Sequence, residues 1–506
     1  MADPGQQTRA PGAHGARAGA VAALLALAAL RMLLVVAPAP MYGYANNYDF
    51  IRVSAWFDLW PLPPAGRETL DPQAQHPSAP LRCYRIDHDV TSYIRYPTAE
   101  LAFVWLALRA NDAWRALTGP RTCELDLRVL GLLRAAILLA AGLAVTVAFF
   151  RRSPRAGVVS ALILATVLSD PAVVLLFNTL YSEFSTLLFA YLAVAGIVYV
   201  AAFARFGIAS GLALGAVLLG LAASKTQYAG LALALCAILA FATLVRRDRR
   251  TSRRARRATV ALAAVASLTG LLLQQRAMSD GGYMWSMRMG AATDAFFGAF
   301  LAHHADPDRG VALLGLPERC RPYVGRTWYD EGMQPPPCPE VGTVPRLRLV
   351  RLLIDDPGLA LRLAARALPL LRPLIVRHYG QVEGESYAQA DARWRAGIVS
   401  LSVLVEALPT AAFAALLALT VLAAARAVVR LTAAAEGSHD DDLLLPLLVL
   451  ALTVVEAYSF SSSLVGAGFI DLARHSLLGQ LAFATLVPAS LLLLRRASGG
   501  RQSARG

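Results

Sequence analysis

Acidic, basic and amide side chains gather in four short stretches of an otherwise apolar chain. These stretches read NNYDFIR (46–52), SDPAVVLLFNTLYSEF (169–184), SKTQY (224–228) and DLARH (471–475). A carboxylate can act as a general base toward a sugar or lipid hydroxyl, and a lysine or arginine can neutralise a departing phosphate. The candidate site residues are Asp49, Arg52, Asp170, Asn178, Tyr181, Glu183, Lys225, Arg474 and His475.

Lys225 is the only lysine of the chain, beside 47 arginines. Scarce lysine and asparagine beside abundant alanine, glycine and leucine are typical of a GC-rich genome. A basic residue at the end of an apolar run can simply extend its charge to the membrane surface. Arginine serves that purpose elsewhere in this chain, so a compact ammonium that approaches a phosphate closely is the favoured role for Lys225.

The composition places these stretches in a membrane. Of the 506 residues, 57% are hydrophobic and 16% are charged, and the mean hydropathy is +0.50. Apolar runs of about 20 residues, long enough to cross a bilayer as helices, recur along the chain. They predict an all-α polytopic membrane protein with about ten transmembrane helices, at 18–38, 131–150, 156–177, 183–203, 207–223, 229–245, 258–273, 398–424, 443–460 and 475–495.

Arginines mark every second connector between these runs, most densely in RRDRRTSRRARR (246–257). By the positive-inside rule, these connectors and both termini are cytoplasmic. The net charge of +14 therefore indicates topology and contact with membrane lipids, and a nucleic-acid partner is not expected. Ala37-Pro38-Ala39 resembles a cleavage site, but the apolar run before it is long for a signal peptide, which favours an uncleaved helix.

This topology divides the chain into five parts. They are a cytoplasmic tail (1–17), a transmembrane core (18–273) with a first outer loop (41–130), a second outer segment (274–397), C-terminal helices (398–495) and a cytoplasmic tail (496–506). The outer loops contain two amphipathic stretches, 96–114 and 346–374. All four polar stretches then lie at the outer membrane face, where ionisable groups are candidates for a functional site.

Four of the five cysteines lie in the outer segments, Cys83 and Cys123 in the first and Cys320 and Cys338 in the second. On the oxidising side of a membrane they predict two local disulfides, 83–123 and 320–338. A zinc site is the alternative, but the chain has no C-x-x-C spacing to support it.

A metal site is a weaker hypothesis elsewhere. Asp87 and Asp89 in RIDHD have the spacing of carboxylates that share one hard cation, and a divalent cation is the one cofactor that the sequence leaves open. The chain has no Walker loop, G-x-S-x-G or H-E-x-x-H motif.

The layout resembles the GT-C superfamily of integral-membrane glycosyltransferases. NNYDFIR, SDPAVVLLFNTLYSE and DLARH are similar to motifs of the bacterial WsfD-like glycan hexose transferases. The resemblance implies a bacterial inner-membrane enzyme that transfers a sugar from a polyprenyl-phosphate donor to a glycan or lipid acceptor on the extracytoplasmic side. Asp49 would then activate the acceptor or hold a cation. Lys225, Arg474 and His475 would lie near the lipid phosphate, and Asp170, Tyr181 and Glu183 would line the same cavity.

Two other functions remain open at this point. Clustered polar residues among ten spans also describe a transporter or flippase of lipid-linked sugars, although the chain shows no internal repeat of the kind that transporters carry. A non-catalytic subunit of envelope polysaccharide assembly would share the fold without the activity.

Overall fold

The computed structural model describes residues 11–45, 48–62, 79–87, 96–118, 123–245, 252–279, 283–376, 379–385, 391–433 and 440–499. Within these ranges, eight helices are long and apolar enough to cross a membrane. They are α1 (Pro11–Val36), α4 (Leu127–Phe150), α7 (Glu183–Ala202), α9 (Ala229–Val245), α10 (Arg253–Ser279), α17 (Thr410–Ala433), α18 (Asp440–Ala467) and α20 (Leu477–Gly499). The chain is a polytopic all-α membrane protein, as the sequence predicts.

A ninth candidate span, here called the broken span, is bent. The helix α5 (Pro154–Ile163) continues through η3 (Leu164–Leu168) and then bends by 66° onto α6 (Pro171–Val174) and η4 (Leu175–Asn178). Pro171 has no backbone N–H to continue the helical ladder, and the Asp170 side chain caps the new helix by accepting a hydrogen bond from the backbone N–H of Ala172 at 3.0 Å. The remaining expected span corresponds to α8 (Ile208–Ala222), a shorter apolar helix of 15 residues.

One expected boundary was wrong. The sequence predicts a single helix over 398–424, whereas the structure has α16 (Leu401–Ala407) and then α17 from Thr410. Pro409 disfavours helical geometry at the residue before it, and Leu408 is extended. The transmembrane helix therefore begins about three turns later than predicted.

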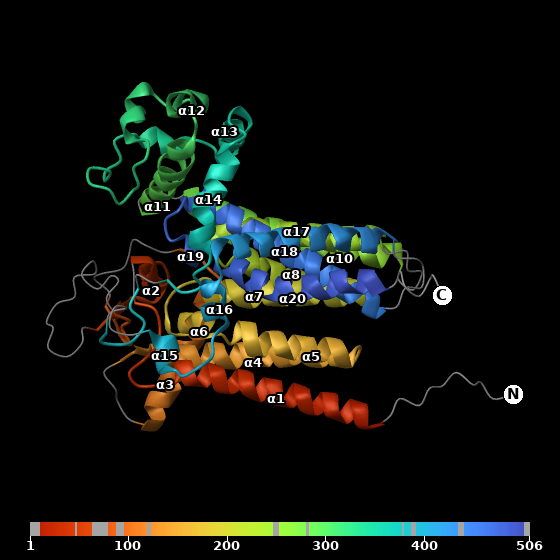
Figure 1. The fold of residues 1–506 in the computed structure, drawn as a ribbon. Helices are drawn as coiled ribbons and strands as arrows, with labels where there is room; N and C mark the ends of the chain where they lie inside the picture. The colour runs from red at the N-terminus through yellow and green to blue at the C-terminus, as the bar shows by residue number, and fades with distance from the viewer. Residues whose placement is uncertain are drawn as a thin grey trace.

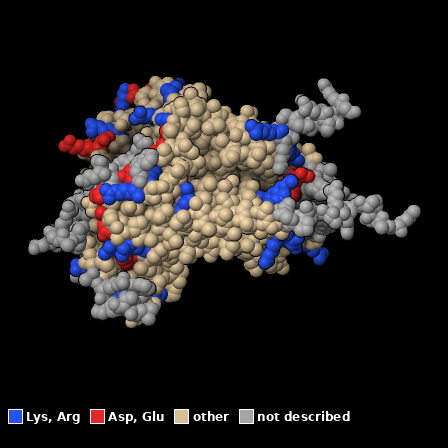
Figure 2. Space-filling view, turned by 60° about the horizontal axis from the view of Figure 1, so that its bottom comes forward, with Lys and Arg blue, Asp and Glu red and all other residues tan. Residues whose placement is uncertain are grey.

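The long helices lie along one direction in Figure 1, and the start of α1 and the end of α20 lie at the same end of the bundle. A broad belt without charged side chains separates two charged ends in Figure 2. Such a belt is what a hydrocarbon layer requires of a protein surface.

The first outer segment forms a small sheet at the end of the bundle opposite to the termini. Its elements are η1 (Tyr48–Phe50), α2 (Ile51–Ser54), η2 (Ala55–Phe57), β1 (Leu59–Pro61), β2 (Cys83–Ile86), α3 (Glu100–Thr118) and β3 (Leu125–Asp126). The strands pair antiparallel in the order β1-β2-β3, with Trp60 opposite Arg85 and Cys83 opposite Asp126. A disulfide joins Cys83 to Cys123, with 5.2 Å between their Cα atoms.

The second outer segment forms a lobe, here the outer lobe, with a hydrophobic core of its own. It contains α11 (Tyr283–Thr293), η6 (Asp294–Phe300), η7 (Leu301–His303), α12 (Pro307–Leu314), η8 (Glu318–Tyr323), η9 (Pro339–Thr343), η10 (Arg346–Arg348), α13 (Leu349–Asp355) and α14 (Leu359–Leu371). Phe296, Leu314 and Leu352 lie fully buried in its core. The short helix α15 (Ala392–Arg395) follows α14 in the chain.

Candidate functional site

Arg474 lies at the centre of a group of charged side chains. Its Nη2 is 2.6 Å from Oδ2 of Asp49 and 3.2 Å from Oδ2 of Asp471. The other carboxylate oxygen of Asp49, Oδ1, forms an ion pair with Arg52. The arginine therefore joins the start of the first outer segment to α19 (Leu472–His475), a short helix between α18 and α20.

The turn that carries α19 depends on a glycine. Gly468, just after α18, adopts φ +62°, and a Cβ at this position would lie 2.3 Å from the backbone oxygen of Asp294. A residue with a side chain would have to displace the outer lobe there. The close approach therefore sets α19 against the lobe.

Two tyrosine rings hold the guanidinium of Arg474. Its Cζ is 5.3 Å from the ring centre of Tyr181 and 5.9 Å from that of Tyr379, within the range of cation–π attraction. Both hydroxyls are anchored, since Tyr181 donates to the backbone oxygen of Ala45 at 2.7 Å and Tyr379 donates to Asp471 at 3.1 Å. The arginine is thus fixed in position before any ligand binds.

Lys225 forms the second arm of the group. Its Nζ lies 3.0 Å from Oε1 of Glu183 and 3.3 Å from Nδ1 of His475. The lysine immediately precedes η5 (Thr226–Tyr228), where the backbone N–H of Thr226 donates to the hydroxyl of Tyr96 at 2.7 Å. The first outer segment therefore positions the turn that carries the lysine.

These contacts set the charge states of Asp49 and His475. Burial opposes ionisation of Asp49, but Arg52 and then Arg474 hold the pKa of this carboxyl well below its usual range. Burial, followed by the positive charges of Lys225 and Arg474, lowers the pKa of His475 to about 3. His475 is therefore neutral at physiological pH, and its Nδ1 is assigned as the acceptor for the ammonium of Lys225.

Solvent reaches part of this group. The side chains of Arg52, Asp49 and Lys225 are 22%, 20% and 13% exposed, whereas that of Arg474 is 6% exposed. Seven of the nine predicted site residues thus form one connected group at the end of the bundle opposite to the termini. This charge cluster consists of Asp49, Arg52, Tyr181, Glu183, Lys225, Arg474 and His475, together with Asp471 and Tyr379.

The other two predicted residues make structural contacts. Asp170 caps α6, accepts hydrogen bonds from Ser400 Oγ at 3.0 Å and the Leu401 N–H at 2.7 Å, and lies 3.9 Å from Arg31. Asn178 is fully buried and donates to the backbone oxygen of Tyr42 at 2.6 Å. Both residues hold the broken span against its neighbours.

Replacement of Asp170 by alanine should therefore destabilise the fold. The variant loses a helix cap and leaves several donors unsatisfied, at a cost of about 1–3 kcal/mol. Thermal unfolding in a mild detergent measures this, with Asp441→Ala at an exposed helix start as the control, expected within about 0.5 kcal/mol of the wild type. Equal stability of the two variants would contradict the structural role of Asp170.

Sequence reasoning missed one ion pair close to the charge cluster. Arg134 of α4 and Glu100 of α3 are both completely buried, with 2.7 Å between Nη2 and Oε1. Arg134 also donates to the backbone oxygens of Phe177 and Thr179. The available signal was a single arginine inside an apolar run, which is costly at membrane depth and therefore informative.

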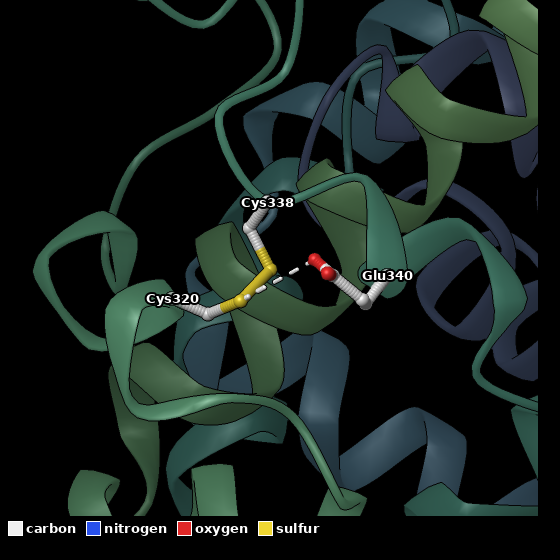
Figure 3. A group of neighbouring side chains, drawn as sticks. All are labelled: Cys320, Cys338 and Glu340. Atoms are coloured by element: carbon white, nitrogen blue, oxygen red, sulfur yellow. Dashed lines mark hydrogen bonds between the residues drawn. A yellow bond between two sulfur atoms is a disulfide. The ribbon is translucent and has the colours of Figure 1, made fainter.

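The predicted metal site at Asp87 and Asp89 lies only partly within the described residues. Asp87 Oδ2 lies 3.5 Å from Arg85 Nη2, and its predicted partner Asp89 lies outside the described residues. Among those that the structure describes, one group has three potential ligands in reach of each other, Cys320, Cys338 and Glu340. Figure 3 shows that the two sulfurs are joined in a disulfide, with Cα atoms 5.3 Å apart, so neither is a thiolate that could bind zinc.

Comparison with known proteins identifies a family. The model of the YfdI N-terminal transmembrane domain matches residues 13–340, which is more than half of the chain. The chain belongs to the YfdI N-terminal transmembrane domain family. The matched region includes Asp49, Glu183 and Lys225 of the charge cluster and ends before α19.

Two solved structures resemble the chain at low similarity. One is the archaeal oligosaccharyltransferase AglB from Archaeoglobus fulgidus in complex with an inhibitory peptide and a dolichol-phosphate, with a TM-score of 0.38, 15% identity, and coverage of 95% of this chain and 52% of that one. The other is an Archaeoglobus fulgidus oligosaccharyltransferase tethered to an acceptor peptide containing the NVT sequon, with a TM-score of 0.38, 14% identity, and coverage of 92% and 49%. The chain thus spans about half the length of these structures. No curated protein matches it.

Proposed function

We propose that this YfdI-family protein is a GT-C-type membrane glycosyltransferase. It would transfer a sugar from a polyprenyl-phosphate donor to a hydroxyl of a cell-envelope glycan or lipid, at the extracytoplasmic face of the bacterial inner membrane. The observation that carries this proposal is the charge cluster, where Arg474 is 2.6 Å from Asp49. Basic groups suited to a phosphate lie there beside a carboxylate suited to a hydroxyl.

The basic side of the cluster fits a lipid-linked phosphate. Lys225, Arg474 and Arg52 come from three separate segments, and in the resting state each is paired with a carboxylate. An arriving phosphate competes with those carboxylates for the same cations. Because Arg474 is held between two rings, little reorganisation would be needed to stabilise the departing phosphate.

The acidic side fits activation of the acceptor. While Arg52 and Arg474 hold it, Asp49 is a weak base, because its pKa lies well below the usual range. When the donor phosphate engages these arginines, that pKa rises, and Asp49 becomes a better proton acceptor. The acceptor oxygen then bonds to the anomeric carbon and its proton passes to Asp49. The bond from that carbon to the phosphate oxygen breaks with its electron pair, leaving the lipid phosphate.

The carboxylates of the cluster are paired with basic side chains. Asp49 and Asp471 share Arg474, and Glu183 pairs with Lys225, so a hard cation would have to displace these basic groups to gather several oxygen ligands. No step of the proposed mechanism uses a metal.

Incubation of the purified protein, in proteoliposomes, with a labelled polyprenyl-phosphate sugar and an acceptor tests the proposal. The expected products are free lipid phosphate and labelled acceptor, and Asp49→Asn should reduce their formation by about 100-fold or more. Movement of the intact donor across the membrane without bond cleavage would contradict the proposal in favour of a flippase. Absence of both activities from the folded protein would favour an assembly subunit.

Substitution of Lys225 separates the need for charge from the need for lysine. Lys225→Ala should lower the transfer rate by about 10²-fold through loss of phosphate stabilisation. Lys225→Arg should retain part of the rate because arginine keeps the positive charge. The rest should be lost because the guanidinium is larger than the ammonium. Initial rates at saturating donor measure both, with Arg319→Ala on the surface of the outer lobe as the control. A Lys225→Ala variant as fast as this control would remove the lysine from the mechanism.

A further inference from the structure

A stripe of apolar side chains faces outward on the outer lobe. Leu347, Val350 and Ile354 are 78%, 46% and 73% exposed. They follow η10 and α13 at spacings of three and four residues, which places them on one helical face. We call these three residues the outer stripe.

The opposite face of the same helix is also apolar. Leu349 and Leu352 are 3% and 0% exposed and belong to the core of the lobe. A helix between a protein core and water normally presents polar residues to the water. Two apolar faces therefore indicate that the outer stripe also has an apolar environment.

The position of α13 suggests what that environment is. In Figure 1, α13 and α14 run across the bundle helices and reach beyond the side of the bundle, at the end where α19 lies. The helix α14 packs against both α17 and α19. Because the bundle spans the membrane, a helix beyond its side at this level lies over the lipids that surround it.

The charges of the segment fit a membrane surface with anionic lipids. Residues 346–372 contain six arginines and two aspartates, Asp355 and Asp356. These aspartates pair with Arg309 and Arg362, while Arg351 is exposed beside the outer stripe. Basic residues beside an apolar face are typical of interfacial helices.

The neighbouring helix repeats this pattern. On α14, Leu361 is 76% exposed and Arg366 is also exposed. Its buried residues Leu359, Leu363 and Ala367 face inward at four-residue spacing. Both helices therefore present exposed apolar side chains next to exposed arginines.

From these observations, we propose that η10, α13 and α14 form a membrane-docking surface. The outer stripe and Leu361 insert into the interface of the outer leaflet, and Arg351 and Arg366 contact the phosphates of anionic lipids. This surface is independent of the sugar-transfer proposal.

Docking on the membrane would fix the position of the outer lobe relative to the helix bundle, next to the charge cluster. The lobe contacts the turn before α19 through Asp294, whose backbone lies against Gly468 and whose Oδ1 accepts the Trp328 N–H at 2.7 Å. Gly468 is three residues before Asp471. Lipid contacts at α13 would therefore stabilise the approach that positions α19.

The test uses a fluorescent probe on the full chain in liposomes. Ile354→Cys or Leu347→Cys, in a Cys236→Ala background, is labelled with a polarity-sensitive fluorophore. Tyr329→Cys is the control, because Tyr329 is 72% exposed in the same lobe and lies outside the outer stripe. In phosphatidylglycerol-containing liposomes, the fluorescence emission of probes on the outer stripe should shift to shorter wavelength. Spin-labelled lipid in the same liposomes should quench it. The control probe should show neither effect.

A charge reversal tests the anionic component. Arg351→Glu combined with Arg366→Glu should weaken quenching of the Ile354 probe in phosphatidylglycerol and change it less in phosphatidylcholine. Equal quenching of the Ile354 and Tyr329 probes would overturn the proposal. A probe at Ile354 that is shielded from water but unaffected by spin-labelled lipid would also overturn it, because the stripe would then cover a protein partner.

Discussion

Arg474→Ala should reduce sugar transfer by about 10²–10³-fold, which is the loss expected when one preorganised charged donor is removed from a developing negative charge. Arg474 contacts Asp49, Asp471 and two tyrosine rings. The variant loses the basic group proposed to bind the phosphate and an ion pair that lowers the pKa of Asp49. Arg474→Lys should be intermediate, because one ammonium cannot reproduce a planar guanidinium between two rings.

The pH dependence provides a second readout for the same variant. Removal of a cation beside a carboxylate disfavours its ionised form, so the pKa of Asp49 should rise in Arg474→Ala. Arg52 remains in place and limits the rise. If Asp49 is the base, the acidic limb of the rate profile should move to higher pH, because a higher pH is then needed to ionise it.

Initial rates from about pH 3 to pH 8, which include the range where a carboxyl titrates, together with the thermal midpoint in detergent, measure these effects. Arg348→Ala is a matched control, since this arginine donates to the backbone oxygen of Leu314 in the outer lobe and lies outside the charge cluster. An Arg474→Ala variant that is folded and as active as Arg348→Ala would exclude Arg474 from the phosphate site.

Arg134→Met should lower the free energy of unfolding by about 3–5 kcal/mol, as expected when one partner of a buried ion pair is removed. Glu100 would remain buried with a single strong contact, the backbone N–H of Ser185 at 2.9 Å. The backbone oxygens of Leu176, Phe177 and Thr179 would also lose a shared donor. Leu176 and Phe177 lie in the short 3₁₀ helix η4, and Thr179 follows it directly. The last carbonyls of a helix lack partners within the helix and need others at membrane depth.

The double variant Glu100→Gln with Arg134→Met should recover part of this loss, because it removes the unpaired charge. Chemical or thermal unfolding in detergent measures all variants, with Arg128→Met as the control. Arg128 is 27% exposed, and its partner Asp126 keeps a second arginine, Arg82, when Arg128 is replaced, so about 1 kcal/mol or less is expected. Equal losses for Arg128→Met and Arg134→Met would show that the buried pair has no special role.

The helices could be predicted largely from the sequence, because the length and apolarity of a membrane span are local properties. The break at Pro171 and the late start of α17 after Pro409 were missed, since hydropathy alone does not register a bend inside an apolar run. Both prolines were visible in the sequence. Each proline interrupts the helical hydrogen-bond ladder, an effect that hydropathy does not contain.

The site could be predicted only in part. Arginine-rich connectors alternate with connectors poor in arginine, which predicts that the polar stretches lie at the same membrane face. This was sufficient to predict that Asp49, Lys225 and Arg474 are near one another. Which side chains meet could not be predicted, because Asp49 and Arg474 are 425 residues apart in the chain and no local pattern encodes their contact. Asp170 and Asn178 lie in one of these stretches, but their side chains form hydrogen bonds with backbone and hydroxyl groups and do not join the charge cluster.

The contact between Asp49 and Arg474 has a consequence for biogenesis. Asp49 follows the first span and Arg474 precedes the last one, so the pair can form only after almost the whole chain has been translated. At about 5–20 residues per second, Asp49 is synthesised roughly 20–85 s before its partner. Nascent chains that lack the last helices therefore carry Asp49 without its ion pair to Arg474.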